Sequence, residues 1–309
     1  MSTSWQPSAS IDNIKVRAQI LWNVRKFFHN RNVIEVQTPL LGRTTVTDRY
    51  ITSFEIPGEG YLQTSPEYLL KRLLAAGMPS CYQLASVFRD DESGRWHNPE
   101  FTMLEWYRIG FSATDLQREV AELVDCILGK TEYVTWSFDT LIEQQLSIEF
   151  AQLNSQKLHS ILPKLGYHGT LKTHEVNDFL YSQATQRPLP PRLFICDFPK
   201  ESAALAKTKM VNGKVVAERF ELWVNQLEIA NGYDELVDAA ELSRRMDKDN
   251  QLRDDDGLPK IAKDIKLLAA MEYGLPTCAG VALGFDRLCA LKVNAISLDE
   301  VLSFSNDRV

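Results

Sequence analysis

Hydrophobic and polar positions predict a helix, a short strand and a long-looped hairpin in the first third of the chain. Residues 11–31 carry apolar side chains at helical spacing with basic side chains between them, which predicts an amphipathic helix. Residues 33–39 alternate like a strand that a proline closes. A helix is expected over 66–76, and strands are expected over 82–88 and 100–107. The two strands flank a charged loop, so we expect them to pair as a hairpin.

The middle of the chain has a different pattern. In residues 113–190 the apolar side chains recur at helical spacing, and no group of residues typical of an active site stands among them. We therefore interpret this segment as a helix-rich insertion in a single domain spanning 1–309. Strands follow over 193–199, 215–225 and 227–236. Because several strands succeed one another as hairpins, the sheet should be mainly antiparallel and the fold class α+β.

Composition narrows the range of functions. The charged content is 24%, and 34 basic against 41 acidic residues give a net charge of −7, whereas a dedicated nucleic-acid binder is usually basic. The five cysteines show no metal-ligand spacing and fit reduced thiols. No apolar run approaches the roughly 20 residues that a membrane span needs, and the N-terminus lacks the pattern of a secretion signal. We therefore expect a cytoplasmic protein with no membrane partner.

Two segments carry candidate nucleotide chemistry. Residues 88–107 place arginines, His97 and several carboxylates in one loop between apolar and aromatic runs. Such a loop could offer arginine to phosphate and an aromatic ring to a base. Near the C-terminus, Arg287 stands where a strand is expected to give way to a helix, and Gly280 and Gly284 would let backbone approach a ligand. Neither a phosphate-binding Gly-rich loop ending in Gly-Lys-Ser/Thr nor a dinucleotide fingerprint is present.

Four glutamates stand among apolar or small neighbours. Glu221, Glu228 and Glu235 recur every seven residues, and Glu105 lies between a leucine and a tryptophan. Ionised carboxylates are rarely buried unless they are paired or bind cations. They could form a pocket for Mg²⁺ or for an ammonium group. The alternative is that each points to solvent from an alternating strand.

The residues of the charged loop resemble a known family. Residues 88–107 resemble motif 2 of class II aminoacyl-tRNA synthetases in the version of the lysyl subgroup, with Arg-x-His-Asn-Pro-Glu-Phe-Thr-Met-x-Glu-x-Tyr standing at 95–107. Residues 280–287 resemble motif 3. The first helix and the strand ending at Pro39 resemble motif 1, the dimer-forming element. The resemblance implies a class II synthetase-like antiparallel sheet flanked by helices, and a homodimer.

Only residues 1–10 precede the first expected helix, so no anticodon-binding domain is expected. The chain therefore resembles the stand-alone paralogues of lysyl-tRNA synthetase, the elongation factor P–(R)-β-lysine ligases. That family activates β-lysine with ATP and transfers it to a lysine side chain of elongation factor P. The resemblance implies ATP and Mg²⁺ as cofactors, elongation factor P and β-lysine as partners, and no stable binding of tRNA.

The resemblance also implies roles around the nucleotide. Arg89 would grip the α-phosphate and stabilise the charge that develops there, and Phe101 would stack on adenine. Arg287 would cover the other face of adenine and reach the outer phosphates with His97. Further implied nucleotide contacts are Asp90, Asp91, Asn98, Glu228, Ile229 and Gly284. Asp91 stands where the family usually has glutamate, one methylene longer.

The remaining implied roles concern the amino-acid substrate and the metal. Ser65, Pro66 and Glu67 would meet the substrate amino group, while Glu105, Tyr107 and Glu235 would hold the far ammonium. Glu221 and Glu228 would bind Mg²⁺ that bridges the phosphates. At Ala282 the synthetases that charge tRNA typically have glycine, and the extra methyl group should disfavour α-lysine relative to a β-amino acid.

Two other functions stay open at this point. One is a truncated lysyl-tRNA synthetase that charges tRNA, which the expected lack of an anticodon-binding domain and the net charge of −7 disfavour. The other is a catalytically inactive binding module, which the presence of both arginines and the acids disfavours.

Overall fold

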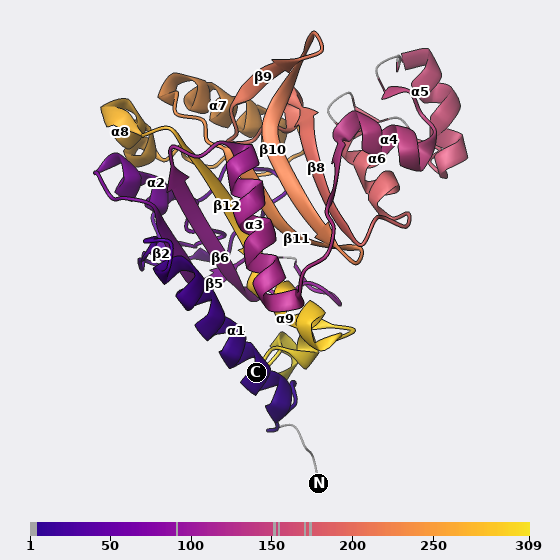
Figure 1. Cartoon of the computed structure of the whole chain (residues 1–309). Coiled ribbons are helices and arrows are strands. Elements are labelled where there is room, and N and C mark those ends of the chain that lie inside the picture. Colours follow the sequence, from indigo (N-terminus) through magenta and orange to yellow (C-terminus); the bar gives the residue numbers. More distant parts are fainter. Residues whose placement is uncertain (1–4, 91, 151–152, 154, 170, 173–174) are drawn as a thin grey trace. The chain divides into compact units, whose positions relative to one another are not determined.

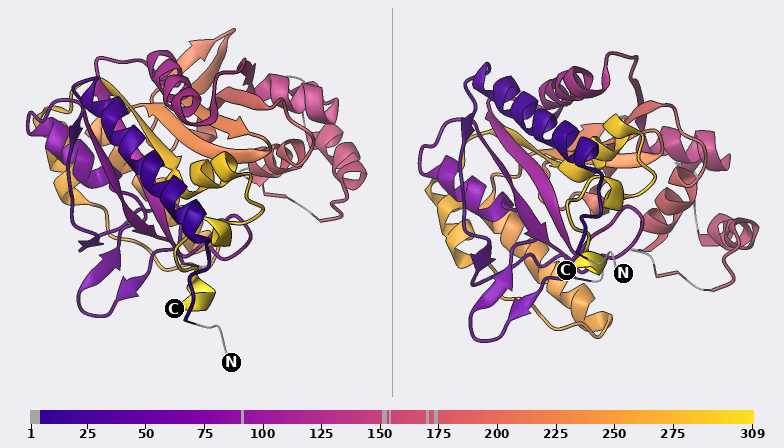
Figure 2. Two further views of the ribbon diagram at one scale, coloured as in Figure 1. Left: turned by 60° about the horizontal axis from the view of Figure 1, so that its bottom comes forward. Right: turned by 90° about the horizontal axis from the view of Figure 1, so that it is seen from below.

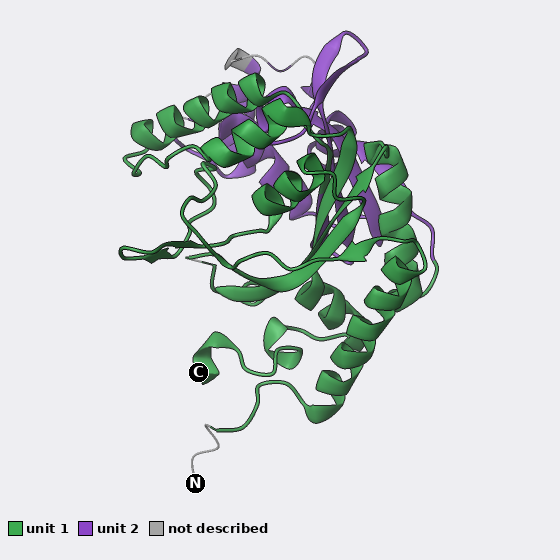
Figure 3. Ribbon diagram, turned by 90° about the vertical axis from the view of Figure 1, so that its left-hand side faces the viewer, with its two compact units in different colours: residues 1–130, 232–309 green, residues 131–231 purple. Residues whose placement is uncertain are grey.

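The computed structural model describes residues 5–90, 92–150, 153, 155–169, 171–172 and 175–309. The chain divides into two compact units (Figure 3). Unit 1 comprises Met1–Lys130 and Gly232–Val309, and unit 2 comprises Thr131–Asn231. The predicted Asp91 lies outside the described residues.

Unit 1 is built on a mixed sheet (Figure 1). Its strands are β1 (Ile34–Glu35), β5 (Cys81–Phe88), β6 (Glu100–Ile109) and β12 (Cys278–Gly284), in that order across the sheet. β1 runs parallel to β5, whereas β5–β6 and β6–β12 are antiparallel. A second, small antiparallel sheet contains β2 (Leu41–Gly42), β4 (Gly60–Leu62) and β3 (Glu55–Ile56).

Helices α1 (Ile11–His29), α3 (Ala113–Leu128) and α9 (Phe285–Val293) of unit 1 contact one another. Phe28 of α1 stacks on Tyr82 of β5 with ring centroids 4.4 Å apart, and it meets Trp106 of β6 edge-on at 5.3 Å. Helix α1 therefore lies across one face of the β5–β6 hairpin (Figure 2).

The remaining helices of unit 1 form a second group. α2 (Glu67–Ala75) packs on α8 (Ile265–Gly274), which in turn contacts α7 (Ala239–Asp255). Short 3-10 helices follow α9 at Leu298–Glu300 and Asn306–Arg308.

The two faces of β6 carry different side chains. Successive side chains of a strand point to opposite faces. Trp106 points to the face that α1 covers, so Glu105 and Tyr107 on either side of it point to the other face. All three side chains are buried.

Unit 2 holds the strands β7 (Val134–Ser137), β8 (Arg192–Pro199), β9 (Thr208–Val211) and β10 (Lys214–Val224), and β11 (Leu227–Asp234) begins in it. β8–β10 and β9–β10 are antiparallel, and β7–β8 is parallel. Its helices are α4 (Phe138–Leu146), α5 (Ser155–Ile161) and α6 (Val176–Thr185), with 3-10 turns at Leu162–Leu165 and Lys200–Ser202. Its core joins α4, α6 and β8 through buried apolar residues including Phe138, Leu141, Leu180, Leu193 and Ile195.

The predicted α+β class with a mainly antiparallel arrangement is confirmed. The strand expected over 33–39 forms only over Ile34–Glu35, and the Val36 N–H adds one backbone hydrogen bond of 2.9 Å to the Tyr82 carbonyl. Helices α7 and α8 were not expected from sequence, and α7 has few buried apolar positions from which to infer it. None of the described helices is both long and apolar enough to cross a membrane.

The units do not coincide with the expected insertion. Residues 113–128 form α3, which packs on α1, α9 and β12 of unit 1. Unit 2 in turn extends past residue 190 to include β8, β9 and β10. That the helical part is an insertion in one domain stays a prediction.

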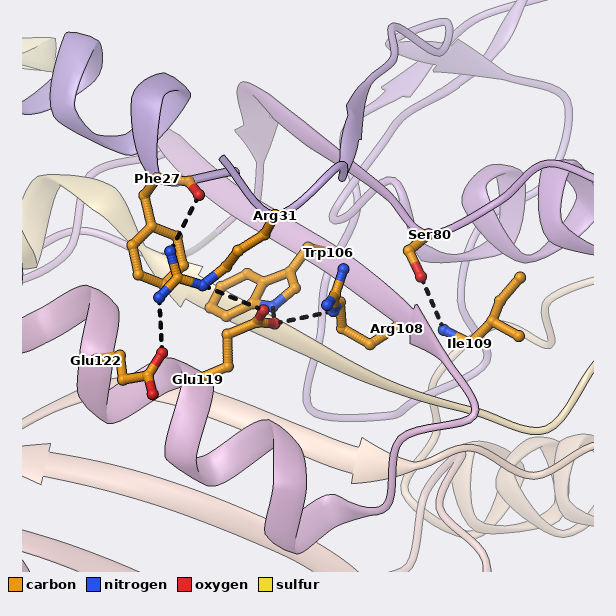
Figure 4. Close-up of polar contacts among 8 residues, drawn as sticks. All are labelled: Phe27, Arg31, Ser80, Trp106, Arg108, Ile109, Glu119 and Glu122. Carbon is orange, nitrogen blue, oxygen red and sulfur yellow. Dashed lines mark hydrogen bonds and ion pairs between the residues drawn. The ribbon is translucent and has the colours of Figure 1, made fainter. Parts of the chain in front are cut away.

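A buried carboxylate on α3 contacts both β6 and the residue that follows α1 (Figure 4). Glu119 of α3 is 5% exposed and accepts a hydrogen bond of 3.1 Å from the Trp106 indole N–H. It also pairs with Arg108 of β6 at 3.3 Å and with Arg31, which follows α1, at 3.8 Å. Arg31 further pairs with the exposed Glu122 at 2.7 Å. These charges border a cavity of about 450 Å³ and neutralise one another within its wall.

We expect Glu119→Ala to lower the free energy of unfolding by about 1–3 kcal/mol, because Arg108 and the Trp106 N–H would lose a buried partner. The matched control is Glu122→Ala on the same helix, which removes an exposed ion pair and should change stability by about 0.5 kcal/mol or less. Urea unfolding measures both values. Equal losses of unfolding free energy in the two variants would show that the buried contacts of Glu119 add no more stability than an exposed ion pair.

Candidate active site

The face of β6 opposite α1 carries a pocket of acidic side chains. The Tyr107 hydroxyl donates a hydrogen bond of 2.7 Å to Glu105 Oε1, and both side chains are buried. Glu235, which follows β11, is 1% exposed, and its backbone N–H donates to the Cys278 carbonyl. A Cβ built on Gly280 would lie 2.3 Å from the Tyr107 ring and 2.4 Å from Glu235 Oε1. The bare backbone of Gly280 therefore lets these two side chains meet beside β12.

The pocket contains a lysine that the sequence did not indicate. Lys71 on α2 is 1% exposed, and its Nζ lies 2.6 Å from Glu67 Oε1 and 2.6 Å from Glu235 Oε2. We call Glu67, Lys71, Glu105, Tyr107 and Glu235 the acidic pocket. The one signal in the sequence is the spacing of Glu67 and Lys71, which lie four residues apart and so face the same side of a helix.

Burial and charge set the protonation of the acidic pocket. Burial, and then the charge of Glu67, raises the pKa of Glu105 to about 8 against the opposing hydrogen bond from Tyr107. Burial likewise raises the pKa of Glu235 although Lys71 opposes it. Burial would lower the pKa of Lys71, but Glu235 and Glu67 together outweigh it and raise that pKa. Lys71 therefore stays charged, and a carboxyl group takes up a proton near neutral pH.

Two buried oxygens of the acidic pocket, Glu105 Oε2 and Glu235 Oε2, accept no hydrogen bond from the described residues, and of the two only Glu235 Oε2 has an ion pair, with Lys71. Glu105 Oε2 is buried and has no hydrogen-bond partner among the residues that the structure describes. When Glu105 is ionised, Oε2 is an unsatisfied buried acceptor, which is costly, and a ligand that donates to it recovers that free energy. A cationic donor such as an ammonium group would satisfy this oxygen.

A second cluster stands at the loop that leaves β5. The Arg89 guanidinium lies 5.3 Å from the centre of the Phe101 ring. Arg89 approaches Glu92 at 3.9 Å, and the same carboxylate lies 3.4 Å from His97 Nε2. The Arg287 guanidinium in turn lies 2.8 Å from His97 Nε2. The structure thus brings together the four residues predicted for phosphates and adenine.

His97 is held in its neutral form. Burial, and then the positive charges of Arg287 and Arg89, lowers the pKa of His97, while Glu92 opposes this. Because Arg287 can only donate, the neutral imidazole accepts its hydrogen bond. Two guanidinium groups and an imidazole around a single carboxylate suit an incoming polyanion that replaces Glu92.

Backbone contacts fix the ends of the motif 2 loop. The Asp90 N–H donates to the Thr52 carbonyl at 2.8 Å. Asn98 donates to the Glu100 carbonyl at 2.6 Å and accepts the Asn306 N–H at 3.1 Å. The C-terminal segment thereby holds the predicted nucleotide residue Asn98. Gly284 directly precedes α9, and a Cβ there would meet the Arg287 side chain at 3.5 Å, an ordinary contact.

The sequence model of the family described as tRNA synthetases class II (D, K and N) matches residues 4–308. The chain belongs to this family. An elongation factor P–(R)-β-lysine ligase of Edwardsiella ictaluri (strain 93-146) is 41% identical over 320 residues, covering 99% of this chain and 98% of that protein. Proteins of the same name from Yersinia pestis (strain Pestoides F) and Yersinia pseudotuberculosis serotype O:1b (strain IP 31758) are 41% identical over 318 residues, covering 98% of each chain. The resemblance to class II synthetases is confirmed.

Other predicted substrate residues of this class II synthetase chain flank the acidic pocket. The Ser65 hydroxyl accepts the Glu67 N–H at 3.1 Å, and Pro66 stands at the start of α2. Ala282 lies directly opposite Glu105 in the β6–β12 ladder and is half-buried. Their contacts with a substrate stay predictions.

The predicted metal ligands lie in unit 2. Glu221 Oε1 pairs with Arg219 at 2.5 Å, and its other oxygen accepts from the Tyr181 hydroxyl and from the Trp223 N–H at 3.2 Å. Both oxygens are thus engaged, so Glu221 in this arrangement does not fit an open Mg²⁺ ligand. On β11, Glu228 is half-buried and Ile229 is buried. Among the described residues no group of three or more His, Cys, Asp or Glu side chains is placed to hold a metal ion.

The raised pKa of Glu105 predicts how stability depends on pH. Folding favours the neutral carboxyl group. The stability that neutral Glu105 contributes is therefore fully present below about pH 4.5 and is lost as the pH rises through about 8. The midpoint of thermal unfolding of the ligand-free protein should therefore fall between pH 6 and pH 9 more steeply than that of Glu105→Gln, whose side chain stays neutral.

The control is Glu100→Gln, which changes an exposed glutamate of the same strand. Its midpoint should follow the wild-type curve. A Glu105→Gln curve parallel to the wild-type curve would show that Glu105 is ionised throughout this range.

Proposed function

We propose that the chain is an ATP-dependent ligase that activates (R)-β-lysine as an aminoacyl-adenylate and transfers it to a lysine side chain of elongation factor P. The relatives that match nearly its whole length carry the name of this activity. The observation that carries the proposal is the acidic pocket, in which the buried Glu105 and Glu235 and the half-buried Glu67 share one resident ammonium group, that of Lys71, which pairs with Glu67 and Glu235. This excess of negative charge suits a substrate with two ammonium groups.

The spacing of the two clusters along β6 supports the same reaction. Phe101 and Glu105 stand four residues apart and so point to the same face of the strand. Their separation is about 13 Å at about 3.3 Å per residue. The α-phosphate of ATP and the carboxylate of the amino acid would meet in that interval, near Arg89.

The reaction has two steps. The substrate carboxylate attacks the α-phosphorus of ATP, so that a mixed anhydride forms and pyrophosphate leaves. Arg89 stabilises the charge that develops on the phosphoryl oxygens, and Arg287 binds the outer phosphates. The acidic pocket holds the diamine so that its carboxylate meets the α-phosphate.

In the second step a neutral lysine ε-amine of elongation factor P attacks the activated carbonyl. An amide forms and AMP leaves with the electron pair of the broken bond, while the amine loses its proton to solvent or to a nearby base. Mg²⁺ would supply further neutralisation of the phosphates, with Glu228 as its predicted ligand in this chain. The proposal includes a cytoplasmic location.

The proposal also includes a homodimer formed through α1 and β1. Trp22 of α1 is 63% exposed and Ile34 of β1 is 45% exposed, so this element presents large apolar side chains that a partner could cover.

The test is the intact mass of elongation factor P after incubation with the protein, ATP and each lysine isomer. Addition of one lysyl group, most efficient with (R)-β-lysine, supports the proposal. Aminoacylation of tRNA with no change in elongation factor P would favour a tRNA-charging enzyme instead, and ATP binding without pyrophosphate exchange would favour an inactive module.

Ala282→Gly should shift the substrate preference toward α-lysine. Ala282 pairs with Glu105 across the β6–β12 ladder, and we infer that its methyl group narrows the space available to the substrate backbone. We expect the ratio of kcat/KM for α-lysine over β-lysine in ATP–pyrophosphate exchange to rise about 10-fold, since one methylene changes discrimination by roughly 10–200-fold. An unchanged ratio would refute this role.

A further inference from the structure

Lys71 is a charged side chain in an apolar setting. It lies on α2 between the fully buried Leu70 and Leu74, and only 1% of it is exposed. A buried ammonium group is stable only if carboxylates compensate it closely. Glu67 and Glu235 do so, each at 2.6 Å from Nζ.

We propose that Lys71 is a positioning and specificity residue, whose ammonium group sets the charge of the acidic pocket and reserves it for a substrate with two ammonium groups. This inference rests on the proposed function and adds a residue for which neither the motifs nor the relatives' names assign a role.

The position of Lys71 determines which carboxylate oxygens a ligand can use. Glu67 Oε1 and Glu235 Oε2 each lie 2.6 Å from the same nitrogen, so these two oxygens are at most about 5.2 Å apart, twice that distance. Lys71 Nζ therefore already occupies the position between the two carboxylates. A substrate ammonium must bind other oxygens, and the buried Glu105 Oε2 without a partner is the clearest of these.

The charge count determines what kind of ligand fits. Glu67, Glu105 and Glu235 carry three negative charges when ionised, and Lys71 cancels one. A diamino acid with both amines protonated brings two positive charges, one near its carboxylate and one at its far end, and completes the balance. A ligand with one ammonium group leaves a buried carboxylate that must stay protonated or uncompensated.

Lys71 also connects two parts of the site, helix α2 and the segment that follows β11. Glu67 belongs to α2, which is predicted to meet the substrate amino group, while Glu235 follows β11 and is predicted to meet the far ammonium. Because the same ammonium group binds both, loss of Lys71 would let the two carboxylates repel each other and move apart. Substrate binding should weaken, while the nucleotide cluster around Arg89 and Arg287 keeps its own contacts.

The experiment compares Lys71→Met with the wild type in ATP–pyrophosphate exchange. Wild-type exchange with β-lysine tests the proposed function, whereas the ratio of variant to wild type tests Lys71. We expect the KM for β-lysine to rise at least 10-fold, the KM for ATP to stay within about twofold, and kcat to fall less than KM rises. Arg72→Met, a change of the neighbouring cation on α2, is the matched control and should leave the KM for β-lysine within about twofold.

Chemical rescue separates charge from packing. Lys71→Ala leaves a space that propylammonium can enter, so added propylammonium should lower the KM for β-lysine, whereas the neutral propanol of similar size should not. The wild type measures any competition by the added amine.

Several results would overturn the inference. They are an unchanged KM for β-lysine in Lys71→Met, an equal rise in both KM values, or equal rescue by propanol. Should Lys71→Met fail to fold, Lys71→Gln makes the same comparison, because its amide still donates to the carboxylates without a charge.

Discussion

The structure of the site depends on the burial of more negative than positive charge behind one strand. Glu67, Glu105 and Glu235 surround Lys71 in unit 1, and all but Glu67 are almost completely buried. Such an arrangement is unfavourable without further protons or cations, which is why burial raises the pKa values of Glu105 and Glu235. A ligand with ammonium groups relieves the same excess. The electrostatic strain of the free pocket is therefore the physical basis of the proposed selectivity.

The β6 strand places this pocket by simple alternation. One face of the strand carries Trp106, which packs on Phe28 and binds Glu119, and so fixes the sheet to α1 and α3. The other face carries Glu105 and Tyr107. A core contact and a proposed substrate contact thus occupy neighbouring positions, and the packing of the first fixes the strand that carries the second. The nucleotide cluster uses the near end of the same hairpin, where Arg89 leaves β5 and Phe101 enters β6.

Local pattern was sufficient to predict the hairpin and the grouping of its charged residues. The apolar and aromatic runs at 82–88 and 100–107 gave the strands, and motif resemblance gave Arg89, His97, Phe101 and Arg287, which the structure brings together. Lys71 was missed because its burial arises from a contact with Glu235, which is far away in sequence. On α2 alone it resembles a surface lysine. Glu221 was expected to bind metal, yet its neighbour Arg219 stands two positions away on the same face of β10 and pairs with it. The insertion over 113–190 stays a prediction; the sequence indicates the helix α3 but not that it packs on α1, α9 and β12, because a helical pattern does not identify the partner of the helix.

The most direct test of this account is calorimetric titration of the protein with (R)-β-lysine at pH 7 in buffers of different ionisation enthalpy. If a carboxyl group of the acidic pocket is protonated before binding, with a pKa of about 8 as for Glu105, the ammonium groups should displace that proton. The account predicts a net release approaching one proton for each substrate bound, which disappears at pH 9.5. Binding heats that are independent of the buffer, or net proton uptake at pH 7, would contradict it.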